Sequence, residues 1–153
     1  MITWSEKYEI GIPVIDGQHK RIVEYINLLK TLDDSDKSNQ QISEILNLLV
    51  DYTLSHFEFE EELMEEADYP AIEAHKKSHL LFKKELDHLQ QLFNNGEDIA
   101  KLLSEMLLNW LLEHIKEDDS SYADCVKHNI LERPPQVHQN WVKNATERYF
   151  KRW

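Results

Sequence analysis

The 153-residue chain is long enough for one domain with a hydrophobic core. Its formal net charge is -12, whereas nucleic-acid-binding proteins are normally basic, so the composition argues against DNA or RNA as a partner. Only 3 Gly and 4 Pro in a chain that is 41% hydrophobic argue against many short strands and tight turns, and Leu-, Glu-, Lys- and Gln-rich runs favour helices. The single cysteine, Cys125, excludes an internal disulfide.

The N-terminus lacks the pattern of a signal peptide, which is a basic segment followed by an apolar stretch. No run of the sequence approaches the roughly 18 apolar residues of a membrane span. From these two observations we expect a soluble, cytoplasmic protein without stable membrane insertion.

Apolar periodicity predicts four helices joined by short loops. Residues 1–15 form an apolar arm, which we expect to cover one end of a helical bundle. Asp16 is expected to cap a first helix at about 17–33. The polar residues of 33–39 then predict a loop.

The remaining three helices have recognisable ends. The second opens at a capping box, Ser38–Gln41, and runs to about residue 66. Pro70 suits the first turn of a third helix at about 70–93, and Asn94–Gly96 ends that helix with residues that accept left-handed conformations. With a fourth helix at about 97–126, the pattern predicts an all-α fold, an antiparallel up-down four-helix bundle.

Five histidines stand on the apolar stripes of these helices, where the pattern otherwise places Leu, Ile or Phe. They are His19, His56, His75, His79 and His114. A lone histidine on an apolar face is usually a core residue with a hydrogen-bond partner. Five of them spread over all four helices indicate a shared site instead, because a buried imidazole is costly unless it is paired or binds a metal.

The other three histidines serve as a comparison. His88 lies nine residues after His79, about half a helical turn away, so we expect it to face solvent. His128 and His138 lie beyond the bundle. The Glu-x-x-His motif that ends at His88 occurs once, whereas ferritin-like di-iron sites need two copies and further glutamates, so the sequence argues against that class.

Carboxylates accompany the histidines and limit the metal. Glu60 lies four residues after His56, on the same helical face. Five imidazoles and two carboxylates exceed the ligand set of one zinc ion, and calcium and magnesium prefer oxygen. Imidazole with carboxylate suits iron, copper, manganese or zinc, so two ions bridged by two carboxylates account for the set.

The second carboxylate has two candidates. Asp119 lies five residues after His114 and is turned about 140° from it, so it needs a side chain that reaches back or a local widening of the helix. Asp118, at spacing four, competes with it. Spacing alone leaves both open.

In combination, these motifs resemble the hemerythrins in their bacterial single-domain form, over roughly residues 1–126. The matching segments are Asp16-Gly-Gln-His19-Lys, His56-Phe-Glu-Phe-Glu60-Glu, His75-x-x-x-His79 and Trp110-Leu-x-x-His114-Ile-x-x-x-Asp119-x-x-Tyr122. The resemblance implies a non-heme di-iron site, two iron ions (Fe2+/Fe3+) with an oxo or hydroxo bridge, that binds O2 reversibly.

The resemblance also implies which residues hold each iron. One iron takes three histidines: His75, His79 and His114. The other takes His19 and His56 and keeps an open position. Glu60 and Asp119 bridge the two irons, so the family pattern selects Asp119 over Asp118.

Four apolar residues resemble those that line the O2 pocket of the family: Phe57, Trp110, Leu111 and Ile115. An apolar pocket around the open position keeps out water and protons, which favour autoxidation. Ordinary core packing is the alternative role, and the two roles are compatible.

Residues 127–153 extend beyond the resemblance. They hold six Lys/Arg and two Asp/Glu, a formal charge of +4, while the 11 Lys/Arg and 27 Asp/Glu of residues 1–126 give -16. After Pro134, an apolar stripe at spacing four, from Val137 to Tyr149, predicts a short amphipathic helix that packs on the bundle. Self-association, a protein partner or contact with a membrane surface are alternative uses of this extension.

The resemblance implies an O2-binding protein for storage, transport or delivery of O2, not an enzyme. A sensor of O2 or redox state that signals to a partner is one alternative, and a di-iron oxidase or NO-reducing enzyme is another. The histidine-rich donor set argues against the enzyme, because oxygen-activating bundles are rich in glutamate.

Overall fold

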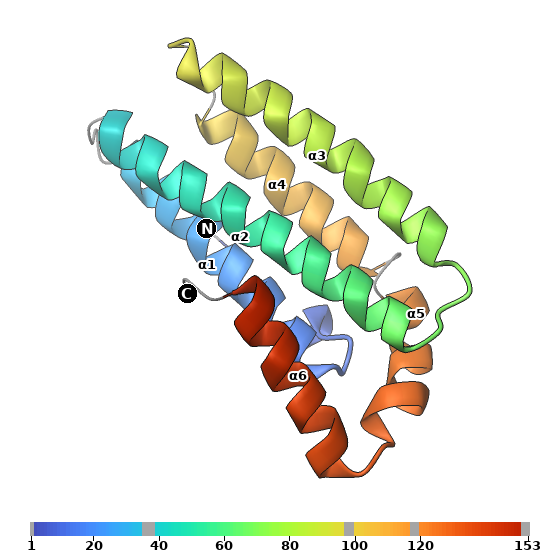
Figure 1. Ribbon diagram of the computed structural model, residues 1–153. Helices are drawn as coiled ribbons and strands as arrows, with labels where there is room; N and C mark the ends of the chain where they lie inside the picture. Colours follow the sequence, from blue (N-terminus) through green and yellow to red (C-terminus); the bar gives the residue numbers. More distant parts are fainter. Residues whose placement is uncertain (1, 35–38, 97–99, 117–119, 151–153) are drawn as a thin grey trace.

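The computed structural model of the protein describes residues 2–34, 39–96, 100–116 and 120–150. Within these ranges it contains helices and no strand. Figure 1 shows the four long helices of the bundle, α1 (Pro13–Asp34), α2 (Asn39–Glu66), α3 (Ile72–Asn94) and α4 (Ala100–His114). The predicted fold class, an antiparallel up-down four-helix bundle with an N-terminal arm and a short C-terminal helix, is confirmed.

The first helix begins at Pro13 rather than at about residue 17. The fixed φ of proline suits the first turn of a helix, where the missing N–H would have no partner. The predicted role of Asp16 as helix cap is therefore wrong. Its carboxylate instead accepts hydrogen bonds from the backbone N–H of Ile10 (2.8 Å) and of Gly11 (3.1 Å), which ties the arm to α1.

The N-terminal arm is shorter than predicted and runs back along α1. It contains a short 3-10 turn, η1 (Glu6–Tyr8). Gly11 has a φ of 86°, a left-handed conformation that favours glycine, at the point where the arm turns into the helix. Near the start of the chain, the Asn27 side chain on α1 exchanges two hydrogen bonds with the backbone of Ile2, of 3.1 and 2.8 Å.

The junction between α2 and α3 differs slightly from the prediction. Asp68 adopts a left-handed φ of 56° after the end of α2, and short polar side chains tolerate this conformation. Pro70 lies in the turn that precedes α3 rather than in its first turn, so that α3 begins at Ile72.

The predicted fourth helix is not α-helical throughout its described residues. α4 ends at His114, and Ile115 and Lys116 are π-helical. The next described element is α5 (Ser120–Val126), which continues as a π-helical segment, η3 (Lys127–Leu131). The helical run therefore extends past residue 126, and Ile130 within it is fully buried. The division of the chain at 126/127 stays a prediction.

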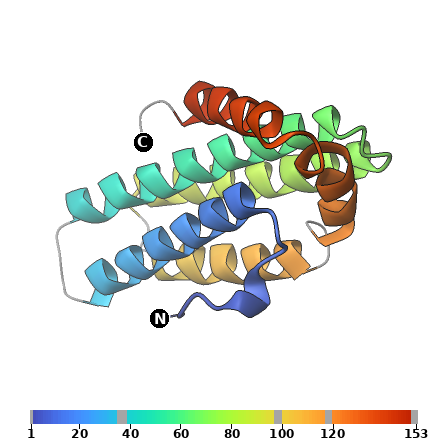
Figure 2. The same cartoon turned by 90° about the horizontal axis from the view of Figure 1, so that it is seen from below.

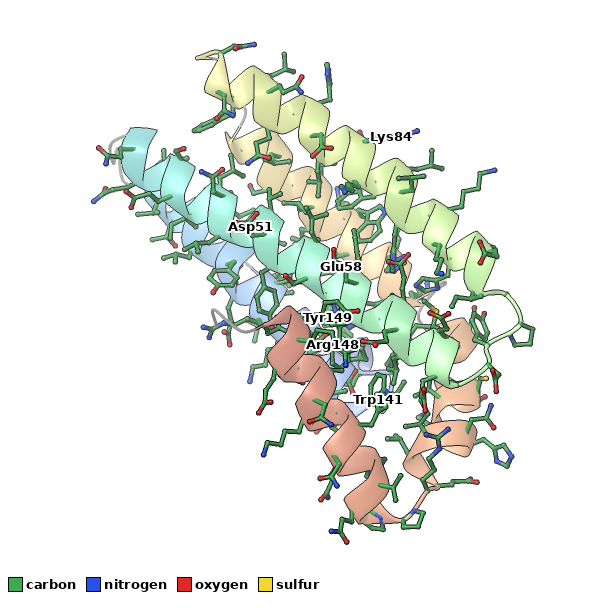
Figure 3. All side chains as sticks on the ribbon, viewed as in Figure 1. Asp51, Glu58, Lys84, Trp141, Arg148 and Tyr149 are labelled. Carbon is green, nitrogen blue, oxygen red and sulfur yellow. The ribbon has the colours of Figure 1, made fainter. Side chains whose placement is uncertain are left out.

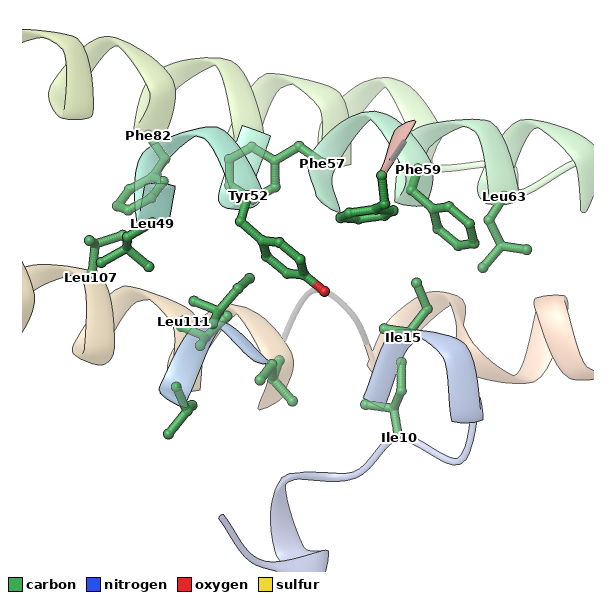
Figure 4. Close-up of a cluster of buried hydrophobic side chains, with 14 of the residues drawn as sticks. Ile10, Ile15, Leu49, Tyr52, Phe57, Phe59, Leu63, Phe82, Leu107 and Leu111 are labelled. Atoms are coloured by element: carbon green, nitrogen blue, oxygen red, sulfur yellow. The ribbon is translucent and has the colours of Figure 1, made fainter. Parts of the chain in front are cut away.

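One contiguous core fills the bundle, and Figure 4 shows a part of it. Ile22, Ile26 and Leu29 of α1 are buried, and so are Leu49 and Leu63 of α2. Burial of each such side chain contributes about 1.5–3 kcal/mol. The packed core holds the inward faces of the helices in register, which positions the histidines that share these stripes.

The C-terminal helix, α6 (Pro135–Tyr149), lies alongside α2 (Figure 1). Figure 2 shows it on the opposite side of the bundle from the N-terminal arm. Ala145 is buried, the Trp141 ring lies 5.9 Å from that of Phe59, and the Phe150 ring lies 4.9 Å from that of Tyr52. Apolar contacts of this kind fix α6 on the bundle.

Ion pairs accompany these apolar contacts. Arg133 pairs with Glu66 at 2.9 Å, and Arg148 pairs with Glu62. Figure 3 shows Arg148 and Tyr149 at the end of α6 that meets α2. Basic residues of the C-terminal segment thus meet acidic residues of α2.

Among the described helices, none is both long enough and apolar enough to cross a membrane.

Candidate metal centre

The four bundle helices bring five imidazoles around one carboxylate, that of Glu60. Glu60 and His56 stand one turn apart on α2, while His75 and His79 stand one turn apart on α3. The remaining two histidines are His19 on α1 and His114 at the end of α4. All six side chains are buried, with exposed fractions of 5% or less.

Three histidines surround one oxygen of Glu60. The distances from Oε1 to the Nε2 atoms are 2.6 Å for His75, 3.0 Å for His79 and 3.5 Å for His114. The Nε2 atoms of His79 and His114 are themselves 3.0 Å apart. We call these three residues the three-histidine half.

Two histidines face the other oxygen of Glu60. The distances from Oε2 to the Nε2 atoms are 3.3 Å for His56 and 3.9 Å for His19. We call these two residues the two-histidine half. The carboxylate therefore divides the five imidazoles into groups of three and two, and Glu60 is the residue that both groups share.

This arrangement fits metal binding. Two ligands about 2.1 Å from one ion and at right angles to each other are about 3 Å apart, which agrees with the 3.0 Å distances from His79 Nε2 to His114 Nε2 and to Glu60 Oε1. Two imidazole nitrogens approach so closely only when a proton or a cation lies between them or beside them. Imidazole and carboxylate donors suit first-row transition metals.

Glu60 is held as an anion by its neighbours. Burial by itself acts to raise the pKa of this carboxyl. The charge of His56 and hydrogen bonds from His114, His56 and His75 act in the opposite direction and dominate, so the pKa of Glu60 lies well below its usual range. A carboxylate that stays ionised in a buried site can bind a cation without first losing a proton.

Two further buried side chains orient these donors. The side-chain oxygen of Gln18 lies 2.7 Å from Nδ1 of His56. Because an imidazole that donates through Nδ1 presents its lone pair at Nε2, this bond orients His56 for metal binding. The hydroxyl of Tyr122 on α5 donates to Oε2 of Glu60 at 3.0 Å, which fixes the orientation of the carboxylate.

The sequence motifs contained both residues but gave no role to either. Gln18 precedes His19, and successive residues on a helix point about 100° apart, so its approach to a histidine of another helix is a tertiary contact that spacing does not reveal. Tyr122 lies eight residues after His114, which is about 80° away on a regular helix. The π-helical residues between them alter that register.

Aromatic rings pack on the three-histidine half. The ring of Phe57 stacks on that of His79 at 4.0 Å, and the ring of Trp110 stacks on that of His114 at 4.3 Å. Leu111 and Ile115 are buried, with exposed fractions of 2% and 3%. All four residues predicted to line an O2 pocket are therefore near the centre or in the adjoining core, and the pocket role stays a prediction.

Asp119 and its competitor Asp118 lie outside the described residues. Of the two alternatives given for a ligand five residues after His114, a local widening of the helix agrees with the π-helical geometry of Ile115 and Lys116. The choice of Asp119 over Asp118 stays a prediction. By contrast, His88 and His128 are exposed, as expected for histidines without a role in the centre.

Comparison with known proteins identifies the family. Residues 10–126 match the family described as "Hemerythrin HHE cation binding domain". The chain is 43% identical to "Bacteriohemerythrin" of Pseudomonas paraeruginosa over 150 residues, 97% of each chain. It is also 43% identical to "Bacteriohemerythrin" of Stenotrophomonas maltophilia over 152 residues, 98% of each chain, and 30% identical to "Myohemerythrin" of Theromyzon tessulatum over 119 residues, covering 78% of this chain and 88% of that one.

A solved structure shares the fold. The crystal structure of wild-type hemerythrin superposes on this chain with a TM-score of 0.76 at 28% identity, covering 82% of this chain and 98% of that one. Residues 10–126, which match the family, include all five histidines and Glu60. The chain therefore belongs to the hemerythrin family, and its buried imidazole and carboxylate cluster lies between four antiparallel helices.

Proposed function

We propose that this chain binds O2 reversibly at a non-heme di-iron centre, for storage, transport or delivery of O2. The observation that carries the proposal is the division of five histidines by Glu60 into groups of three and two. Glu60 would bridge two irons, with His75, His79 and His114 holding one of them. His19 and His56 would hold the other, and Asp119 is the proposed second bridge.

The unequal division supports binding of an external ligand at one ion. When bound, two ferrous ions supply the two electrons that O2 accepts on binding and returns on release. The half with fewer protein ligands is the one with room for O2. In the chain, Gln18 orients His56 in that half through the hydrogen bond to Nδ1.

The surroundings of the centre favour storage of O2 over its consumption. Phe57 and Trp110 cover the rings of His79 and His114 in the three-histidine half, which limits the access of water to the ring faces that they cover. The described donor set holds five imidazoles for one carboxylate, whereas the di-iron carboxylate bundles that activate oxygen are rich in glutamate. We therefore place O2 binding ahead of an oxidase or NO-reducing activity.

A sensor is the second candidate, and one contact favours it. Trp141 of α6 and Phe150, the residue directly after α6, pack on Phe59, with ring distances of 5.9 and 6.0 Å. Phe59 immediately precedes Glu60 in α2, so a movement of the carboxylate would reach α6 through a single buried side chain. In this alternative, the C-terminal segment transmits the state of the centre to a partner.

Visible spectroscopy with measurement of dissolved O2 tests the proposal. The reduced, iron-loaded protein is exposed to air and then flushed with argon. We expect one O2 taken up per chain, with an absorption band that appears in air and disappears under argon over repeated cycles. Continuous O2 or NO consumption with a reductant would instead show an enzyme. A stable band accompanied by altered protease sensitivity of α6 would show a sensor.

A further inference from the structure

His56 in the two-histidine half and His79 in the three-histidine half have different groups behind them. A histidine that binds metal through Nε2 donates Nδ1–H to an acceptor outside the centre, and that acceptor sets the orientation and basicity of the ring. Behind His56, in the two-histidine half, the acceptor is the neutral amide oxygen of Gln18 at 2.7 Å. Behind His79, in the three-histidine half, the facing group is the carboxylate of Glu61, with Oε2 3.9 Å from Nδ1.

The gap between His79 and Glu61 is one that water or a small rotation closes. A separation of 3.9 Å is too long for a direct hydrogen bond, and a bridging water is the usual occupant of such a gap between polar groups. Among the described residues, Nδ1 of His79 has no hydrogen-bond partner although its side chain is only 3% exposed. The Glu61 side chain is 25% exposed, which leaves it free to turn.

Both residues line a surface cavity of about 220 Å³ between α2 and α3. Glu58, Lys76 and Lys83 line the same cavity, so charged side chains form part of its wall. A cavity of this size holds several water molecules. Water can therefore reach the side of His79 that faces away from the centre.

We propose that Glu61 is a positioning residue that accepts the Nδ1–H of His79, directly or through one water. The inference rests on the proposed di-iron centre. A carboxylate acceptor increases the electron density on the imidazole more than an amide acceptor does, and a ferric ion carries one positive charge more than a ferrous ion. Glu61 therefore stabilises the ferric state of the metal in the three-histidine half, and lowers its reduction potential relative to a protein with a neutral amide at this position.

The ordinary role for Glu61 is a solvated charge on the acidic face of α2, together with Glu58, Glu62 and Glu65. Glu58 separates the two roles. It is exposed, carries the same charge on the same helix, and lines the same cavity. Figure 3 shows Glu58 on the outer surface of α2. Glu58→Gln therefore serves as the matched control for Glu61→Gln.

A redox titration of the iron-loaded protein under argon, followed by visible spectroscopy, tests the inference. We expect Glu61→Gln to retain two irons. Its reduction potential should rise by about 59 mV, which for one electron corresponds to a tenfold increase in the ferrous to ferric ratio at fixed potential. Glu58→Gln should leave the potential close to that of the wild type. Glu61→Asp keeps a carboxylate next to the same cavity and should restore most of the wild-type potential.

An equal shift of the potential in Glu58→Gln and Glu61→Gln would overturn the inference, because surface charge alone would then explain the effect. An unchanged potential in Glu61→Gln would also overturn it. If Glu61→Gln loses iron while Glu61→Asp and Glu58→Gln keep it, the positioning role is supported by metal content; loss from all three variants contradicts it. Failure of the wild type to bind two irons refutes the proposed centre itself. A wild type that binds O2 reversibly with no shift in Glu61→Gln refutes only this inference.

Discussion

The side-chain oxygen of Gln18 lies 2.7 Å from Nδ1 of His56 and joins α1 to α2 directly behind the two-histidine half. Both side chains are buried, at 5% and 0% exposure. A hydrogen bond in such surroundings is expensive to break, because the group left behind has no water to replace its partner. Gln18 is thus part of what holds His56 in the orientation that a metal requires.

Replacement of Gln18 by leucine should weaken metal binding in the two-histidine half. Loss of a partner behind a metal-binding histidine typically costs 10- to 100-fold in metal affinity. We expect the iron content of Gln18→Leu to fall from two per chain toward one as a chelator is titrated, while Gln18→Glu, which keeps an acceptor, retains two. Lys20→Leu, on the exposed side of the same helix, is the control. Equal chelator resistance in Gln18→Leu and Lys20→Leu would show that the hydrogen bond is dispensable.

His79 and His88 provide a matched pair on one helix. His79 is buried beside Glu60 and His88 is exposed. We expect His79→Ala to hold at most one iron per chain and to melt at a lower temperature, because the three-histidine half loses a ligand and the core gains a cavity. His88→Ala should match the wild type in both iron content and melting temperature. The same iron content in both variants would contradict the assignment of His79.

The contact of α6 with α2 should contribute to stability mainly through apolar packing. Phe150 is buried against Tyr52 and Phe59, so Phe150→Ala should destabilise the protein by about 3 kcal/mol or more. Arg148→Gln removes an exposed ion pair with Glu62 and should change the urea midpoint far less, since exposed pairs contribute little. A urea midpoint unaffected by Phe150→Ala would show that α6 detaches readily and favour a role in partner binding.

Tyr52 should make the protein sensitive to alkali. Burial, only partly offset by the charge of Arg21, raises the pKa of Tyr52 to about 12, against about 10 in an unfolded chain. Because the folded state holds this proton more tightly, the stabilisation is fully present below pH 10 and is lost as the pH rises from about 10 toward 12. Over this interval the free energy of unfolding of the wild type should therefore fall relative to that of Tyr52→Phe, which has no hydroxyl to ionise at this position. A difference that is constant with pH would contradict the raised pKa.

Residues whose roles depend on helix periodicity were predictable from the sequence. The five histidines share the spacing of the buried Leu and Ile side chains, so their inward direction follows from the pattern on each helix. The same periodicity predicted that His88, about half a helical turn from His79, lies on the exposed face. The grouping of three and two came from resemblance to the family, and the distances around Glu60 agree with it.

Features that depend on contacts between elements, or on departures from the regular helix, were not predictable. Asp16 carries the sequence signature of a helix cap, yet its carboxylate binds the arm because Pro13 starts the helix one turn earlier. The change to π-helical geometry at Ile115 and Lys116, directly after α4, has no local signal in the sequence. The partnership of Tyr122 with Glu60 depends on that geometry, so a regular-helix argument could not place it.

The measurement that tests the central claim most directly is an iron count combined with Mössbauer spectroscopy of the 57Fe-loaded wild type and of Glu60→Ala. Because Glu60 is shared by a three-histidine and a two-histidine half, we predict two irons per chain in the wild type, in two distinct environments of equal weight when O2 is bound. Glu60→Ala should fail to hold the pair. A wild type that binds one iron, or a Glu60→Ala protein that keeps both, would contradict the account of a carboxylate that bridges two metals.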